Sequence, residues 1–468
     1  MKLALPKGKL MARTASWLEE AGLGLTDYFD GSRSYRMSSG RVTGLRAKIF
    51  QEKDIPIQVA MGNYDLGICG LDWIDELLAK YPASALVKVR GLGYGRGSLS
   101  LVCSPLSGID SLDRLRMNGT PLRLVSEYPN LAEAFALKLR LRRFQVLPLW
   151  GAAEVYPPES ADLALVSSWG GGAAPGLLSL SCLLQTSAFL VANTDSWERE
   201  DIAEAVGALM GAASPVEEVE GPKREAPPSP PGGGGDFTRL ALPDGHQLRP
   251  TAEGLKKAGL NLQGYESSGG SRRPTVDLEG FSIKVIRPQD MPLQVANGNF
   301  DLAITGRDWL LDHLYRFPSS PAEGLLDLGF GKVRIVAVVS QELPVEHGRQ
   351  LAKLWEGETL SGIRVASEYT NIADKYARDN HLGAYRVIPT WGASEAFLPE
   401  DADVLIENTE TGQTLKKHNL KIIDTLFEST ACVIGRRGGD MSPAQAGRVA
   451  TFLDILRKAG AGDFGAPV

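Results

Sequence analysis

Short apolar runs alternate with amphipathic stretches along most of the chain. Residues 2–5 (KLAL) are typical of a buried strand, and residues 11–23 carry apolar side chains at helical spacing, which predicts a helix that ends at Gly22. Residues 64–70 and 300–306 predict further buried strands. Because continuous apolar strands that alternate with helices are typical of helix-covered parallel sheets, we expect an α/β protein with parallel sheets.

The periodic pattern of residues along the sequence changes at two places, near Cys103 and near Ser340. This change predicts that each half of the chain forms two lobes. The chain is then expected to return to the first lobe of each half, near Gln185 and near Leu426.

The first half of the sequence returns, in the same order, in the second half. LALPKGKL returns as LALPDGHQL, and KDIPIQVAMGNYDLGICGLDW returns as QDMPLQVANGNFDLAITGRDW. The matching segments are 3–10 and 240–248, 53–73 and 289–309, 125–132 and 366–373, and 148–154 and 389–395. A tandem duplication of one module explains matches that stay in order far better than chance does.

A segment of different composition separates the two copies. Residues 217–237 are rich in proline, glycine and charge and have little to bury, so they are predicted to form a flexible linker. Their four-glycine run does not follow a strand and lacks a following Lys-Ser/Thr, so it is not interpreted as a nucleotide-binding loop. The predicted domains are therefore an N-terminal copy, 1–216, and a C-terminal copy, 238–468.

Composition narrows the class of protein. The chain has 468 residues, of which 43% are hydrophobic and 23% charged, as in a soluble globular protein with more than one domain. No secretory signal and no apolar run long enough to span a bilayer is evident, so a cytoplasmic location is predicted. A net charge of −6 without a basic stripe argues against a nucleic-acid partner.

Cysteine and histidine form no pattern that indicates chemistry. The four cysteines lack CxxC spacing and are interpreted as small buried residues in a reducing compartment: Cys69, Cys103, Cys182 and Cys432. The histidines lack metal spacing and are interpreted as surface or structural residues: His246, His313, His347, His381 and His418. No nucleophile set of the Ser/His/Asp or Cys/His kind is evident, and no metal ligand is predicted from the protein.

The strand predicted at 404–406 leads into the most informative segment. It ends in Glu407 and is followed by a hydroxyl-rich turn that contains Gly412, and then by a helix. Backbone N–H groups and hydroxyls at a helix N-terminus stabilise a phosphate, and an acid at the strand end can hold sugar hydroxyls, so the segment suits a ribose 5-phosphate. An ordinary strand-turn-helix, with Thr409 or Thr411 as the N-cap, fits the spacing equally well.

This segment resembles the phosphoribosyl-pyrophosphate loop of the ATP phosphoribosyltransferase family, an acid followed by Ser/Thr-Gly-x-Thr-Leu. Further family motifs are matched, in family order, by ALPKGKL from Ala4, RPQDMP from Arg287, DLAITGRD from Asp301, LGFGKVR from Leu328 and WGASE from Trp391. Each motif is weak alone, but the ordered set is specific. The chain therefore resembles the short-form catalytic subunit of this family, duplicated in tandem.

The resemblance implies two tandem copies of a two-lobed, type II periplasmic-binding-protein-like α/β fold, arranged as an internal pseudo-dimer. It implies condensation of ATP with phosphoribosyl pyrophosphate to phosphoribosyl-ATP and pyrophosphate, the first step of histidine biosynthesis. Mg²⁺ would arrive with the pyrophosphate substrate, and the partner would be a histidyl-tRNA-synthetase-like regulatory subunit. Such a reaction mainly requires positioning and stabilisation of the departing pyrophosphate.

The two copies differ at the residues that the resemblance singles out. In the N-terminal copy the loop reads VSSWGGGAA, with Val166 in place of Glu407 and Trp169 within the loop. Gly170 and Ala173 replace the threonines, and Gln51, Leu71 and Ser98 stand where the C-terminal copy has Arg287, Arg307 and Arg334. The N-terminal loop is therefore not expected to hold a ribose phosphate.

The C-terminal copy departs from the family elsewhere, with Asp244 and His246 in place of Lys7 and Lys9. A carboxylate in place of a cation reverses one local electrostatic contribution; neutral drift of a surface turn is the alternative. Complementary loss predicts one composite site across the pseudo-dimer. Its expected catalytic residues are Lys7, Arg33 and Arg287, and its expected substrate-binding residues are Lys9, Arg307, Glu407, Thr409, Glu410, Thr411, Gly412, Gln413 and Thr414.

Two other classes of function compete with the enzyme. A non-catalytic paralogue would bind a nucleotide or a pathway metabolite and regulate or scaffold a partner, which the lost lysines favour and the intact loop opposes. A solute-binding protein of the same fold is disfavoured because no export signal is evident.

Overall fold

The computed structural model describes residues 1–29, 32, 34–117, 119–169, 176–199, 202, 206–207, 236–265, 270–354, 362–438 and 441–465. The chain divides into two compact units. Unit 1 comprises Met1–Pro148, Ala161–Glu225 and Trp391–Ala396, and unit 2 comprises Leu149–Ser160, Ala226–Thr390 and Phe397–Val468. Of the linker predicted at 217–237, all but the last two residues lie outside the described part of the chain.

The first lobe of unit 1 is built on a six-stranded sheet of order β2-β3-β1-β4-β11-β5. Its strands are β1 (Lys2–Lys7), β2 (Arg36–Ser38), β3 (Arg46–Gln51), β4 (Leu66–Gly70), β5 (Leu86–Gly91) and β11 (Ala188–Asn193). Its helices are α1 (Met11–Glu20), α2 (Ile55–Ala60), α3 (Leu71–Lys80) and α6 (Thr194–Trp197). Leu3, Leu5, Trp17 and Leu18 belong to one buried core, so α1 packs its apolar face on the sheet as its spacing predicts.

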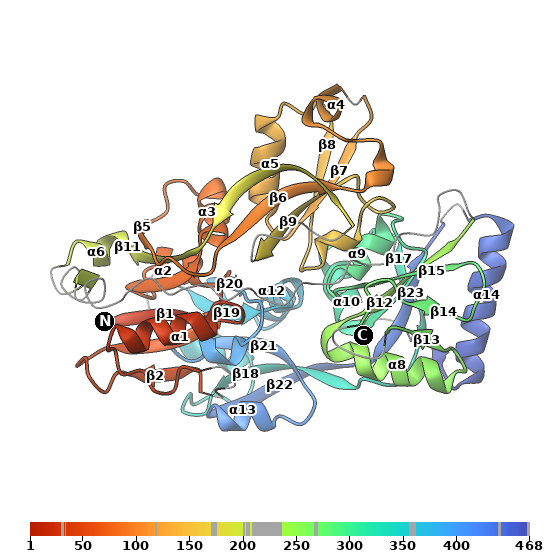
Figure 1. The fold of residues 1–468 in the computed structure, drawn as a ribbon. Helices are drawn as coiled ribbons and strands as arrows, with labels where there is room; N and C mark the ends of the chain where they lie inside the picture. The colour runs from red at the N-terminus through yellow and green to blue at the C-terminus, as the bar shows by residue number, and fades with distance from the viewer. Residues whose placement is uncertain are drawn as a thin grey trace. The chain divides into compact units, whose positions relative to one another are not determined.

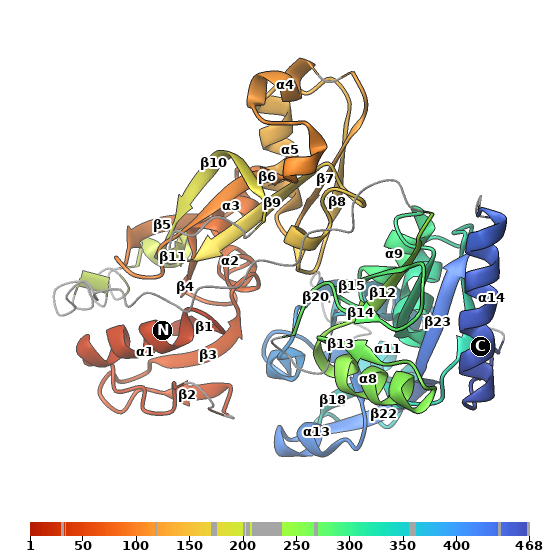
Figure 2. The ribbon, with the colours of Figure 1, turned by 45° about the vertical axis from the view of Figure 1, so that its right-hand side comes forward.

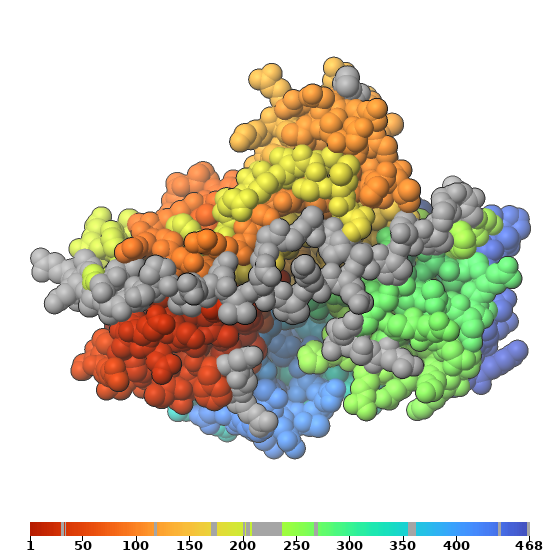
Figure 3. Space-filling model, viewed as in Figure 1, coloured from red at the N-terminus to blue at the C-terminus, as the bar shows by residue number. Residues whose placement is uncertain are grey.

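The second lobe of unit 1 is a five-stranded sheet of order β10-β6-β9-β7-β8. Its strands are β6 (Gly97–Cys103), β7 (Leu122–Ser126), β8 (Phe144–Pro148), β9 (Leu163–Trp169) and β10 (Leu178–Thr186), and its helices are α4 (Leu112–Met117) and α5 (Pro129–Lys138). The strand β10 forms an edge of this sheet and lies at the surface of the lobe (yellow in Figure 3).

Unit 2 repeats this architecture with sheets of order β15-β12-β16-β23-β17-β24 and β20-β19-β21-β18-β22. The first sheet contains β12 (Thr238–Pro243), β15 (Phe281–Ile286), β16 (Leu302–Gly306), β17 (Ala322–Asp327), β23 (Ala431–Arg436) and β24 (Gly462–Asp463). The second contains β18 (Val333–Ser340), β19 (Ile363–Ser367), β20 (Tyr385–Pro389), β21 (Val404–Thr409) and β22 (Leu420–Ser429). The equivalent strands follow the same order in both units, which confirms the duplication.

The helices of unit 2 cover both of its sheets. They are α8 (Leu248–Lys257), α9 (Met291–Ala296), α10 (Arg307–Arg316), α11 (Arg349–Leu354), α12 (Thr370–Asp379), α13 (Gln413–Lys417) and α14 (Pro443–Lys458); β13 (Leu262–Gln263) and β14 (Thr275–Val276) form a small separate ribbon. Short 3-10 helices lie at η1 (Pro105–Ser107), η2 (Ala153–Val155), η3 (Gly245–Gln247) and η4 (Ser394–Phe397). Figures 1 and 2 show α14 alongside the first sheet, where Phe452 and Leu456 join its core.

Two features of the fold differ from the sequence prediction. The sheets are mixed rather than parallel, because β11 and β23 run antiparallel to both of their neighbours and β6 and β18 also pair antiparallel. The change of lobe comes earlier than predicted, since the strands that end at Cys103 and Ser340 already belong to the second lobe. The predicted return to the first lobe is confirmed: β10 and β22 contain Gln185 and Leu426, and the next strand belongs to the first sheet.

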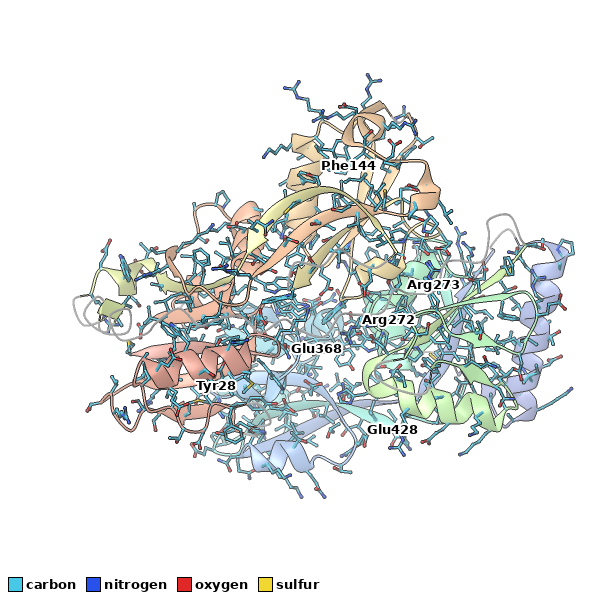
Figure 4. All side chains as sticks on the ribbon, in the orientation of Figure 1. Tyr28, Phe144, Arg272, Arg273, Glu368 and Glu428 are labelled. Carbon is cyan, nitrogen blue, oxygen red and sulfur yellow. The ribbon has the colours of Figure 1, made fainter. Side chains whose placement is uncertain are left out.

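A short segment from the first half of the sequence packs within unit 2. Glu159 accepts hydrogen bonds from Arg273, labelled in Figure 4, at 2.8 Å and from Lys284 at 2.9 Å. Lys284 also donates to the carbonyl of Tyr156 at 3.2 Å. The Lys284 side chain is 4% exposed. Because a buried cation needs a partner, Glu159 is required for this packing, and losing one member of such a buried pair typically costs about 3–5 kcal/mol.

Candidate functional site

A buried carboxylate joins the two lobes of unit 2. Asp308 follows β16 in the first lobe, and Tyr369 follows β19 in the second. The Tyr369 hydroxyl donates to Asp308 Oδ2 at 2.6 Å, and the Ser429 hydroxyl donates to Oδ1 at 3.0 Å. Burial raises the pKa of Asp308, while the hydrogen bonds from Tyr369 and Ser429 oppose that rise. The carboxyl ends of strands from both lobes therefore meet here, which is where ligands bind in open α/β sheets.

The hydroxyl-rich turn lies between β21 and α13, as the sequence predicts. Thr409 is buried, and its Oγ1 accepts the N–H of Gly412 at 2.9 Å. Gly412 has φ of 71°, a left-handed conformation that favours glycine, and it is the N-cap of α13. The Thr411 hydroxyl accepts the N–H of Gln413, the first residue of α13, at 3.5 Å, and the side chains of Thr411, Gln413 and Thr414 are exposed. Both Thr409 and Thr411 therefore accept backbone N–H groups of the turn, as the alternative of an ordinary threonine-capped turn also predicts.

Arg334 lies beside this turn, although sequence reasoning did not place it in the site. In the antiparallel pairing of β18 with β21, Arg334 is directly opposite Thr409, so their side chains share one face of the sheet. Arg334 forms no ion pair with any other described residue. The signal was available in the sequence, since Arg334 belongs to the LGFGKVR motif and Ser98 replaces it in the N-terminal copy.

In the first lobe of unit 2, Asp244 lies between two arginines. Its carboxylate pairs with Arg272 at 2.7 Å and with Arg287 at 3.3 Å, and its side chain is 8% exposed (Arg272 is labelled in Figure 4). The N-terminal copy has Tyr35 and Gln51 at the positions of these arginines. Two guanidinium groups outweigh one carboxylate, so the neighbourhood keeps a net positive charge despite the loss of Lys7 from this copy. Comparison of the turns alone missed this compensation.

A cavity of about 990 Å³ opens beside this group of charges in unit 2. Its charged lining residues come from the end of β12, the α8 helix, the segment before β14 and the end of β15: Asp244, Arg249, Glu253, Lys256, Arg272 and Arg287. The volume lies at the upper end of that of small-molecule sites, and cations predominate among these residues, so the cavity suits a large anionic ligand.

The lysines predicted in the site lie at the equivalent turn of unit 1. This turn needs glycine, since Gly8 has φ of 95°. Lys7 Nζ is 3.4 Å from Tyr35 Oη, and Lys9 Nζ is 5.6 Å from the centre of the Trp169 ring. Arg33 lies outside the described residues.

The loop region of unit 1 differs in structure as well as in sequence. Ser168 occupies the position of Thr409, and its hydroxyl is hydrogen-bonded to the hydroxyl of Ser98 at 2.9 Å. Two serines therefore replace the cross-strand neighbours Arg334 and Thr409 of unit 2. Trp169 ends β9 and contacts Lys9, and residues 170–175 lie outside the described part of the chain.

Arg307 begins α10 and contacts the C-terminal tail of the chain. Its guanidinium lies 5.0 Å from the centre of the Phe464 ring, and the strand β24 beside Phe464 pairs with β17. An arginine over an aromatic face is held in a defined orientation by cation–π attraction. The tail therefore positions a residue that the sequence analysis assigned to substrate binding.

Glu52, which the sequence analysis did not single out, occupies the end of β3 in unit 1. Its pKa is raised from 4.5 to about 8, mainly by burial and also by the charge of Asp72, against the opposing effects of the Leu10 N–H and the charge of Lys9. The folded chain therefore keeps a proton that the unfolded chain releases between pH 4.5 and 8. Stability falls as pH rises through this window.

We expect Glu52→Gln to remove this pH dependence. The variant should match the protonated wild type near pH 5 and exceed the wild type in unfolding free energy near pH 8 by a few kcal/mol, since one unit of pKa shift corresponds to about 1.4 kcal/mol. Urea unfolding at both pH values measures the difference. Glu20→Gln, at an exposed glutamate of α1, should change neither value; an unchanged pH profile in Glu52→Gln would contradict the assignment.

None of the described helices has both the length and the apolar content needed to cross a bilayer. Within the described ranges, no three His, Cys, Asp or Glu side chains are grouped so that they could hold a metal ion.

The paired lobes and the strand order define both halves of the chain as two-lobed, type II periplasmic-binding-protein-like α/β modules. A family model described as ATP phosphoribosyltransferase matches residues 51–211 and again residues 287–457. The chain belongs to the ATP phosphoribosyltransferase family, and its two matches to the family model lie in tandem.

Individual relatives agree with this assignment. The chain is 32% identical over 224 residues to the ATP phosphoribosyltransferase of Metallosphaera sedula, covering 47% of this chain and 72% of the relative. It is 29% identical over 226 residues to that of Chlorobaculum parvum, covering 47% and 71%. Among solved structures, the ATP phosphoribosyl transferase (HisG:HisZ) complex from Thermotoga maritima is 21% identical with a TM-score of 0.38, covering 48% of this chain and 98% of that chain.

Proposed function

We propose that the chain transfers a phosphoribosyl group from phosphoribosyl pyrophosphate to N1 of the adenine of ATP, as the first step of histidine biosynthesis, at a loop in the C-terminal copy. The observation that carries this proposal is the turn from Glu407 to Thr414. It has the exposed hydroxyls of Thr411 and Thr414 at the start of a helix, a left-handed Gly412 and Arg334 alongside it. In the sequence of the N-terminal copy, Gly170 and Ala173 replace the two threonines and Ser98 replaces Arg334.

The reaction needs little acid–base chemistry from the protein. Thr411, Thr414 and the N–H groups of α13 bind the 5-phosphate, and Glu407 accepts hydrogen bonds from the ribose hydroxyls. As the bond from C1 to pyrophosphate breaks, positive charge develops on the ribose and negative charge on the leaving group. Arg287 and Arg272 stabilise that leaving group, and the rest of the acceleration comes from holding N1 against C1.

Magnesium enters this proposal with the substrate. The exposed carboxylate of Glu410 and the carboxylate of Glu407 are the oxygen ligands of this turn, and Mg²⁺ is commonly held by one or two carboxylates together with substrate phosphates. The ion would neutralise part of the pyrophosphate charge. The residues of the turn are compatible with such a shared ion.

The N-terminal copy contributes cations in this proposal. Lys7, Lys9 and Arg33 are retained in the copy whose own loop has lost the acid and the threonines. We assign them to the composite site, at the polyphosphate of the ligand bound by the C-terminal copy. A histidyl-tRNA-synthetase-like regulatory subunit is the proposed partner, and the cytoplasm is the proposed location.

Release of pyrophosphate tests the proposal directly. The full chain, mixed with ATP, phosphoribosyl pyrophosphate and Mg²⁺, should release pyrophosphate and form phosphoribosyl-ATP, with or without the regulatory subunit. Glu407→Gln should lower the rate roughly 10- to 100-fold, because a charged hydrogen bond to the ribose is lost. Val166→Ala, at the equivalent position of the N-terminal copy, should not change it.

One observation favours a second candidate, a non-catalytic paralogue that binds a nucleotide and regulates a partner. Asp244 holds Arg287 and Arg272 in ion pairs, and a carboxylate at this position opposes an incoming polyphosphate. Binding of phosphoribosyl pyrophosphate without release of pyrophosphate, in the presence of the regulatory subunit, would support this candidate over the enzyme.

A further inference from the structure

Each unit contains a buried, hydrogen-bonded carboxylate between its own two lobes. In unit 2, Asp308 accepts from Tyr369 at 2.6 Å; in unit 1, Asp72 accepts from Tyr128 at 2.8 Å. Both aspartates are at most 3% exposed. Since the pair is present with and without an intact loop, it is a structural part of the module.

One additional hydrogen bond distinguishes unit 2. Asn408 Nδ2 donates to Tyr369 Oη at 2.9 Å, while the backbone N–H of Asn408 donates to Glu407 Oε1 at 2.9 Å. In unit 1 the counterpart of Asn408 is Ser167, whose buried hydroxyl lies close enough to Tyr128 to oppose the rise in the pKa of that tyrosine, but which makes no hydrogen bond of normal geometry with a described residue. A well-formed hydrogen bond from the interlobe tyrosine to the loop strand is therefore found in unit 2, the copy that keeps the loop, whereas the contact in unit 1 is weaker.

Tyr369 is itself held in a fixed place. Its ring packs on Trp309 with centroids 4.2 Å apart, and its backbone N–H donates to Ser367 at 2.8 Å. A rigid acceptor restricts the side-chain rotamer of Asn408, which lies in β21 between Glu407 and Thr409. Because neighbouring residues of a strand point to opposite faces, fixing Asn408 also fixes the directions of Glu407 and Thr409.

We propose that Asn408 and Tyr369 are positioning residues that orient the phosphoribosyl-pyrophosphate loop from the junction of the two lobes, an inference that rests on the proposed function of that loop. Neither residue touches the reacting atoms. They act through Glu407 and Thr409, and they transmit the arrangement of the two lobes to the loop.

The duplicated chain supplies a matched pair of variants. Tyr369→Phe removes one hydroxyl and keeps the ring on Trp309; Tyr128→Phe removes the equivalent hydroxyl in unit 1, where no link to an intact loop exists. We expect similar losses of thermal stability from the two. Only Tyr369→Phe should raise the KM for phosphoribosyl pyrophosphate, about 10-fold, with the KM for ATP unchanged.

Asn408→Ser, which introduces the residue of the N-terminal copy, should reproduce the KM effect without the loss of stability. Combining it with Tyr369→Phe should add little further change, because both variants remove one link. If Tyr369 had only a structural role, Tyr369→Phe would lower thermal stability without changing the KM for phosphoribosyl pyrophosphate relative to the KM for ATP. Equal KM values for Tyr369→Phe, Tyr128→Phe and the wild type would overturn the proposal.

Hydrogen exchange in the free protein gives a readout that needs no substrate. The amide of Gly412, bonded to Thr409, should exchange faster in Tyr369→Phe and Asn408→Ser than in the wild type and in Tyr128→Phe. If the wild type does not bind phosphoribosyl pyrophosphate, the proposed function fails, and the exchange result still tests the link. Unchanged exchange at Gly412 in both variants would refute it.

Discussion

Replacing Lys7 by alanine is expected to lower turnover about 100-fold or more. The lysine is the last residue of β1, in the copy that has lost its own loop, and the proposed composite site uses its charge on the departing pyrophosphate. Removing a charge that stabilises a developing anion in a site of low dielectric typically has an effect of this size. Initial rates of pyrophosphate release at saturating ATP and phosphoribosyl pyrophosphate measure it.

Two comparisons make the Lys7 result decisive. Lys80→Ala, at an exposed lysine at the end of α3, should leave the rate unchanged. Lys7→Arg should recover part of the activity, because it keeps the charge with a different geometry. Full turnover in Lys7→Ala would remove the N-terminal copy from the active site while leaving the family assignment intact.

Replacing Thr411 and Thr414 together by alanine should weaken the binding of phosphoribosyl pyrophosphate by about 1–3 kcal/mol, roughly 5- to 150-fold in Kd. Both side chains are exposed at the start of α13, so their loss leaves no buried group unsatisfied in the free protein. The main effect should therefore appear in binding, and stability should fall little because Thr411 accepts only a long hydrogen bond, 3.5 Å, from the N–H of Gln413. Titration calorimetry and thermal unfolding measure the two quantities separately.

A nearby hydroxyl of the N-terminal copy provides the control, because Gly170 and Ala173 at the positions of the two threonines have no hydroxyl to remove. Ser168→Ala removes a hydroxyl from the strand that leads into the altered loop of unit 1 and should leave the affinity unchanged. Equal weakening by both sets of changes would contradict the asymmetry between the copies.

The order of elements could be predicted from the sequence, whereas the direction of strands could not. Continuous apolar strands such as β4 and β16 are buried on both faces, and the spacing of the repeat located them in both copies. The return strands β11 and β23 are equally apolar, so nothing in their composition reveals that they run antiparallel. The change of lobe was placed too late because β6 and β18 have the same apolar character as the strands before them.

The loop could be predicted because its residues are contiguous, from Glu407 to Thr414. The arrangement around Asp244 could not, because Arg272 lies on a different segment and sequence comparison saw only the lost lysine. Arg334 was noticed as a difference between the copies, but only the pairing of β18 with β21 places it opposite Thr409. Contacts between distant segments depend on strand register, which local patterns do not determine.

The number of phosphoribosyl pyrophosphate molecules bound per chain tests the central claim most directly. Calorimetric titration of the full chain in the presence of Mg²⁺ should give one site, weakened by Thr411→Ala with Thr414→Ala and unaffected by Ser168→Ala. Two equivalent sites per chain, or one site that keeps its affinity in the threonine double variant, would contradict a single loop-bearing site in the C-terminal copy.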